Sequence, residues 1–253
     1  DEGRVGSSID LDSDLSTYLT AANSSLISQS SESTVEAWVK PNSLTSTTMI
    51  YSEAISNGAV YALTTSSDSK GEFGIWHSGW SWATGSVNLV ESDWNHLSGV
   101  YDSGQGMKLY RNGTQDGVNA NTVGAPSVVA SEIGRSNYSL GPAYFDGSID
   151  ELRISSTARS AEWISTEYNN QNDPSTFYTL GSSEAQTTSF KTSWPYRRAI
   201  TLDNTKVDAD LNNFPIVINI DEDGKLANKA QTDGDDIVFT ASDGTTVLSH
   251  EIE

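Results

Sequence analysis

Three tryptophans in one short segment are the side chains with the clearest potential for chemistry. Trp76, Trp80 and Trp82 share one face if Ile75–Trp82 is a continuous strand. Flat indole rings stack on the apolar C–H faces of sugars, so the segment predicts a carbohydrate-binding surface. Packing into the core, with a turn at Gly79, is the alternative.

A carboxylate, Asp150, interrupts an apolar strand pattern. Strict alternation puts Asp150 on the same side as Leu152 and Ile154, which would face a core. A buried carboxylate must be hydrogen-bonded, paired or metal-bound. Two interpretations stay open, a structural Ca²⁺ site and a hydrogen-bond anchor. Glu151 and Arg153 fall on the opposite face, where a cross-strand ion pair or a groove lining is expected.

The charge balance limits the classes of partner. The chain of 253 residues has 34 acidic and 14 basic residues, for a net charge of −20. Nucleic acids need a basic footprint, and anionic membrane surfaces attract basic segments, so neither partner is expected. Spare carboxylates can recruit Ca²⁺. No apolar run approaches the roughly 18 residues of a membrane span, so membrane insertion is not expected either.

The elements that would position these residues are short strands in which apolar and polar residues alternate. They recur from residue 5 to 155 and are separated by Gly, Asn, Asp and Ser. Such spacing is typical of an antiparallel sandwich. Asn112-Gly113 predicts a type I′ hairpin turn. The clearest strands are Thr34–Val39, Val60–Leu63, Phe73–Trp76, His96–Tyr101 and Met107–Tyr110.

One segment has helical spacing instead. Ser160–Tyr168 places Trp163, Ile164 and Glu167 on one face, with Ser160 as N-cap. Asn169-Asn170 and Pro174 are expected to end the helix. We predict one short helix packed on the sandwich through Trp163.

A second β-unit follows a small, polar linker at residues 181–193. Strands are expected at 198–202, 214–220, 236–240 and 246–248, with a turn at Asp243-Gly244. The segment Phe214–Ile220 is almost entirely apolar, which predicts burial on both faces. Since about four strands leave open edges, we predict that the unit is incomplete and self-associates by strand exchange.

The order and spacing of three motifs resemble the laminin-G-like, concanavalin A-like jelly rolls of exported microbial proteins. The resemblance covers residues 3–180 and implies a two-sheet sandwich, export, adhesion or glycan binding, and a structural Ca²⁺ near Asp150. It fixes no particular ligand. The motifs are Thr34–Pro41, Trp94–Gly113 and Ile133–Ile154.

The remainder, Trp194–Glu253, is similar to the first half of a domain of unknown function. That family is found beside laminin-G-like domains in bacterial and archaeal surface proteins. The predicted organisation is therefore a jelly roll at 1–180, a linker at 181–193 and a partial β-sandwich at 194–253.

Groups for catalysis are few. There are three His and no Cys, so no thiolate site or catalytic metal centre is expected. Glucanases with the jelly-roll fold carry a Glu-x-Asp-x-x-Glu cluster for acid/base and nucleophile work, and this chain has none. It also lacks a nucleophile elbow and a P-loop. We predict that the protein is not an enzyme.

These observations lead to one prediction with two alternatives. The chain is predicted to be an all-β, secreted or cell-surface module that binds glycans or matrix polymers. Alternatively it is a structural subunit of an extracellular fibre or layer, or an accessory domain of a glycoside hydrolase. The candidate site residues are Trp76, Trp80 and Trp82 for carbohydrate and Asp150 for Ca²⁺.

Overall fold

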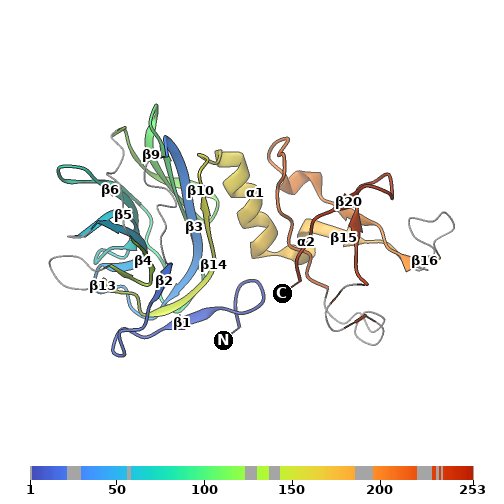
Figure 1. The fold of residues 1–253 in the computed structure, drawn as a ribbon, viewed down its shortest axis with the longest axis horizontal. Coiled ribbons are helices and arrows are strands. Elements are labelled where there is room, and N and C mark those ends of the chain that lie inside the picture. Colours follow the sequence, from blue (N-terminus) through green and yellow to red (C-terminus); the bar gives the residue numbers. More distant parts are fainter. Residues whose placement is uncertain are drawn as a thin grey trace.

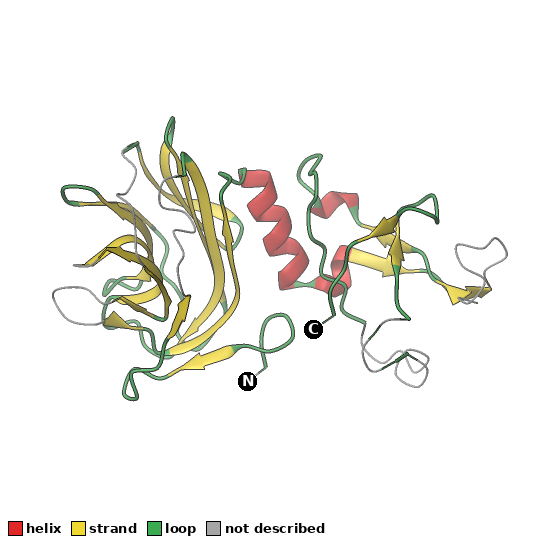
Figure 2. Ribbon diagram, viewed as in Figure 1, coloured by secondary structure: helices red, strands yellow, loops and turns green. Residues whose placement is uncertain are grey.

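Two six-stranded antiparallel sheets lie face to face in the computed structural model, and they form the predicted jelly-roll sandwich (Figure 1). Strands dominate and helices are few (Figure 2). The structure describes residues 2–21, 30–55, 58–122, 130–136, 143–185, 196–220, 230–231, 234 and 236–252.

The helix-side sheet is the one that contacts the main helix. Its order is β1-β14-β3-β8-β9-β10. The β9–β10 hairpin turns at Asn112-Gly113, where both residues have positive φ, which confirms the predicted turn. The strand bounds are β1 Ile9–Leu11, β3 Glu32–Pro41, β8 Asn95–Asp102, β9 Gly106–Arg111, β10 Thr114–Asn119 and β14 Gly147–Ser155.

The tryptophan-side sheet has the order β2-β11-β4-β5-β6-β7, so β7 is an edge strand. A short β12–β13 pair follows β11 in the chain. The bounds are β2 Leu19–Ala21, β4 Thr48–Ile55, β5 Gly58–Thr65, β6 Gly71–Trp76, β7 Trp80–Thr84, β11 Ala130–Ile133, β12 Arg135–Ser136 and β13 Ala143–Tyr144.

Side chains from both sheets fill the space between them. Val35, Ala37 and Val39 of β3 point into this core. The alternate residues Glu36 and Trp38 point the other way, yet they are also buried. A strand covered on one face would leave them in water, so the second face must be covered too.

Helix α1, Ala161–Asn172, covers that second face (Figure 1). Its N-cap is Ser160, whose hydroxyl accepts from the Trp163 N–H at 3.2 Å, as predicted. The helix continues through Asn169-Asn170 to Asn172, and the short helix α2, Pro174–Phe177, follows. Trp163 is buried against Val100 and Tyr110, which confirms its predicted core role.

The segment Phe214–Ile220 differs from its prediction as a strand buried on both faces. It is irregular and at most half-buried, and it runs along α1. The Asn170 side chain accepts from the Val217 N–H at 2.6 Å and donates to the Val217 carbonyl at 3.1 Å. A helix side chain thus takes the place of a neighbouring strand. The Phe214 ring meets the Trp163 ring edge-on at 4.9 Å.

In the described residues of the C-terminal part, the strands form only short pairs. Strand β15 comes directly after α2 and pairs with β18, so the end of the predicted jelly roll is paired with a strand of the predicted second unit. Most of the predicted linker, residues 186–193, lies outside the described residues. Asp243-Gly244 turns the β19–β20 hairpin as predicted. The bounds are β15 Tyr178–Leu180, β16 Glu184–Ala185, β17 Tyr196–Arg197, β18 Ile200–Leu202, the 3-10 helix η1 Asn204–Lys206, β19 Phe239–Thr240 and β20 Val247–Leu248.

Helices long and apolar enough to cross a membrane are absent from the described ranges.

Candidate functional site

The β6–β7 hairpin brings the three predicted tryptophans together, which we call the tryptophan cluster (Trp76, Trp80 and Trp82). The chain turns at residues 77–79, so Trp76 and Trp80 are direct cross-strand partners. Cross-strand partners lie on the same face of a sheet. The three indoles therefore share a face through a three-residue turn that includes Gly79, and not through the continuous strand on which the predicted common face depended.

The rings form a contiguous group on the face of β6 and β7 opposite Phe73 and Ile75, and Trp76 also packs against the edge of the core. Trp80 and Trp82 are stacked with centroids 4.3 Å apart and planes 16° apart. Trp76 meets Trp80 at 6.1 Å in an edge arrangement, so Trp80 is the central ring. All three side chains are half-buried. The cluster combines a defined geometry with solvent access, as a stacking surface for sugars requires.

Gly74 makes room for the Trp82 ring. It is the cross-strand partner of Trp82, and a Cβ placed on it would lie 2.1 Å from Cε3 of that ring. The next residues across the sheet in the same row are Ala62 and Ser52, which are also small. A row of small residues lets the indole lie against the sheet, which fixes its orientation.

Asp150 does not lie on the core side, and this corrects the predicted register. It pairs with Trp38, on the face covered by α1, whereas Ile154 pairs with the core residue Val35. A β-bulge after Asp150 causes the difference, with Glu151 at a φ of 49°. The extra residue reverses the alternation downstream.

The Asp150 carboxylate holds the N-terminal loop. It accepts from the backbone N–H groups of Arg4 at 2.6 Å, Val5 at 2.9 Å and Glu151 at 2.8 Å. Among the described residues, no three His, Asp or Glu side chains gather into a group that could hold a metal ion. N–H donors do not ligate Ca²⁺, which needs oxygen ligands. This geometry favours the hydrogen-bond anchor, and Ca²⁺ at Asp150 stays a prediction.

Melting experiments separate the two interpretations. Because three N–H groups would lose their acceptor, we expect Asp150→Ala to destabilise the fold by roughly 2 kcal/mol. Asp150→Asn keeps one acceptor oxygen and should lose less. The hydrogen-bond anchor alone predicts that wild-type melts in EDTA and in millimolar Ca²⁺ overlay. A calcium-dependent rise of several degrees that is absent from Asp150→Asn would instead establish an ion site.

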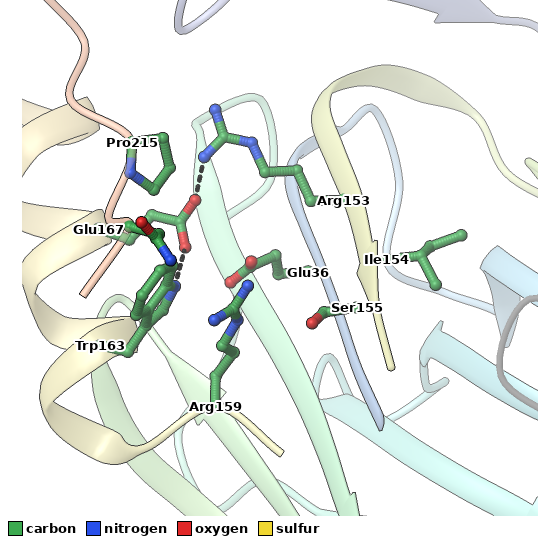
Figure 3. Close-up of a pocket in the computed structure, with 9 residues that line it drawn as sticks. Glu36, Arg153, Ile154, Ser155, Arg159, Trp163, Glu167 and Pro215 are labelled. Atoms are coloured by element: carbon green, nitrogen blue, oxygen red, sulfur yellow. Dashed lines mark hydrogen bonds and ion pairs between the residues drawn. The ribbon is translucent and has the colours of Figure 1, made fainter. Parts of the chain in front are cut away.

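A cavity of about 460 Å³ lies between the helix-side sheet, α1 and the segment around Pro215. Figure 3 shows Glu167 of α1 and Arg153 of β14 pointing toward one another in an ion pair. The Trp163 indole N–H donates to Glu167 at 3.2 Å. Arg153 also pairs with Glu151 of the same strand, so the predicted ion pair forms within β14 and not across strands.

Glu36 of β3 completes this group, and its carboxyl is fully enclosed by protein. Burial raises its pKa well above the ordinary value of 4.5, and the neighbouring Glu167 charge and hydrogen bond raise it further. The Arg153 charge and a hydrogen bond from Ser98 act in the opposite direction. Folding therefore favours the protonated form of Glu36, which can donate a hydrogen bond to Glu167.

This cavity lies where α1 packs on the sheet. Its carboxylates already form ion pairs and hydrogen bonds with other protein groups, so they are not available to a ligand. Sequence reasoning missed it because Glu36, Arg153 and Glu167 meet only when α1 docks. Two signals were available, the polar Glu36 between apolar residues and the four-residue spacing of Trp163 and Glu167 on the helix. The open tryptophan cluster remains the candidate binding surface.

The fold and the edge-strand aromatic cluster define a jelly-roll module with an open face. The family described as the concanavalin A-like lectin/glucanases superfamily matches residues 12–165, more than half of the chain. The chain belongs to this superfamily. No curated protein sequence matches it.

Several solved structures are similar to the chain. Domain 4 of AbnA, a GH43 extracellular arabinanase from Geobacillus stearothermophilus in complex with arabinotriose, has a TM-score of 0.54 at 24% identity, covering 65% of this chain and 77% of that one. The CBM40 of Ruminococcus gnavus IT-sialidase bound to alpha2,3 sialyllactose has a TM-score of 0.51 at 13% sequence identity. The match covers 62% of this chain and 94% of that one.

The binding domain of Paraclostridial Mosquitocidal Protein 1 has a TM-score of 0.54 at 12% identity, covering 88% of this chain and 61% of that one. At these identities the likenesses show the fold.

Proposed function

We propose that the chain is a non-catalytic, extracellular carbohydrate-binding module that binds glycans through the tryptophan cluster. The observation that carries the proposal is the arrangement of Trp76, Trp80 and Trp82 on one open face of the β6–β7 hairpin. Support also comes from two similar folds described with bound arabinotriose and sialyllactose. Attachment to a glycoside hydrolase or to another surface protein is consistent with this role.

Two further parts of the proposal concern the C-terminal part of the chain. We propose that residues 194–253 belong to the second domain family and associate with other strands. One observation favours self-assembly as an alternative function. Among its described residues, several apolar side chains are at least two-fifths exposed, namely Tyr196, Leu202, Val247, Leu248 and Ile252.

Replacing the central ring tests the binding surface. We expect Trp80→Ala to abolish glycan binding, because it removes one ring of each aromatic contact in the cluster. Stacking alone gives affinities of roughly millimolar to micromolar Kd. The melting temperature should stay within a few degrees of wild type, since the side chain is half-exposed on an edge strand. Glycan arrays followed by calorimetry measure the first effect, and thermal melts measure the second.

Trp94→Ala is the matched control, because Trp94 is also half-buried but precedes β8 on the other sheet. It should leave binding unchanged. A large loss of stability in Trp80→Ala would show that the ring is part of the core, and the proposal would fail. A mass that grows with protein concentration in light scattering, without any glycan bound, would favour self-assembly.

A further inference from the structure

The surroundings of the tryptophan cluster contain almost no positive charge. Strands β5, β6 and β7 have no lysine or arginine, and their one charged residue is Glu72. Glu72 is two residues before Gly74 on β6, so it lies on the same face as the indoles. It is half-buried and accepts from the Thr84 hydroxyl at 3.0 Å.

The lysine nearest in the sequence is already engaged, and the other basic side chain beside the cluster is His77, exposed in the β6–β7 turn. Lys70, in the turn before β6, donates to the Ser86 carbonyl at 2.6 Å and to the Asn88 side chain. Strand β10, which packs near β7, contributes the carboxylate of Asp116. The local charge therefore has the same sign as the net charge of −20.

We infer that the tryptophan cluster takes neutral glycans and discriminates against glycans that carry carboxylate or sulfate groups. The inference rests on the proposed function of this site. Proteins hold anionic sugars through charge-assisted hydrogen bonds from Arg or Lys, and the described cluster surroundings offer none that are unengaged. An anionic sugar would lose hydration without gaining a counter-charge, and Glu72 would repel it.

A glycan array that holds each neutral glycan beside its sialylated or sulfated form tests the inference. We expect binding to neutral members and at least a tenfold weaker signal for the matched anionic forms at low salt. Added salt should narrow the difference, because the Debye length falls from about 30 Å at 0.01 M to about 10 Å at 0.1 M. Calorimetric titration of one matched pair then gives the ratio of Kd values.

Two variants locate the source of the discrimination. Glu72→Lys should strengthen binding of the anionic form relative to the neutral form, whereas Glu162→Lys, exposed on α1 beyond the opposite sheet, should not. Anionic forms binding as tightly as neutral ones would overturn the inference and leave the proposed function intact. Binding to no glycan at all would overturn both.

Discussion

Replacing Glu167 by alanine is expected to lower the free energy of unfolding by about 3 kcal/mol, near the lower end of the cost of breaking a buried ion pair. Glu167 is 2% exposed and accepts from Arg153, from the Trp163 indole and from Gln171. The cost stays near the lower end because Arg153 keeps Glu151 as a partner and its side chain is one-third exposed. Urea unfolding at constant pH measures the change.

Glu162→Ala is the matched control on the same helix. Glu162 is exposed in the first turn of α1, where a carboxylate interacts favourably with the helix dipole but is screened by water. Both variants lose the same atoms from the same helix, so propensity effects cancel. Equal midpoints for the two variants would show that the Glu167 network contributes little to docking of α1 on the sheet.

The strands of the sandwich were predictable because burial imposes a period of two on a half-covered strand. Val35, Ala37 and Val39 show this pattern, and Asn112-Gly113 has the residue types that positive φ angles require. The common face of Trp76 and Trp80 was expected only for a continuous strand, and the structure reaches it through the turn at residues 77–79. Local chemistry decides these features.

The location of Asp150 was not predictable by counting residues. One extra residue near Glu151 reverses the alternation, and the sequence there has no glycine to mark a bulge. Phe214–Ile220 shows a similar limit. Its composition favours a strand, but Asn170 of α1 satisfies the backbone of Val217, a contact that depends on tertiary structure.

The polar network beneath α1 should also control how stability depends on pH, through two buried groups with opposite shifts. His96 is buried beside the Trp38 ring, and burial lowers its pKa from 6.5 to about 4. The Arg153 charge lowers it further and the Glu167 charge opposes the shift. Glu36 has its pKa raised by burial and by Glu167.

The sign of each contribution follows from which state binds the proton. Unfolded His96 takes up a proton below pH 6.5 but the folded form does so only near 4, so this contribution of about 3 kcal/mol is lost as pH falls between those values. Folded Glu36 keeps a proton that the unfolded chain loses near 4.5. Its stabilisation is complete below 4.5 and is lost as pH rises toward its raised folded pKa.

Between pH 4.5 and 6.5 the contributions of His96 and Glu36 to the free energy of unfolding change in opposite directions. The Glu36 contribution is therefore best measured as a difference in stability between a variant and the wild type. Glu36→Gln replaces the protonated carboxyl with a neutral amide of similar shape, which can still donate to Glu167. We expect this variant to match wild type near pH 4.5 and to become progressively more stable than wild type as pH rises. Contributions from other groups, including Glu72, whose pKa burial also raises, cancel in the difference.

Urea unfolding of both proteins from about pH 4.5 to 8.5 measures this difference directly, with a slope of about 1.4 kcal/mol per pH unit while Glu36 stays protonated in the folded state. Glu162→Gln is the control, and its difference from wild type should stay flat over this range because Glu162 is exposed and its pKa is lowered. A constant difference between Glu36→Gln and wild type would mean that Glu36 ionises normally. The hydrogen bond from protonated Glu36 to Glu167 would then be ruled out.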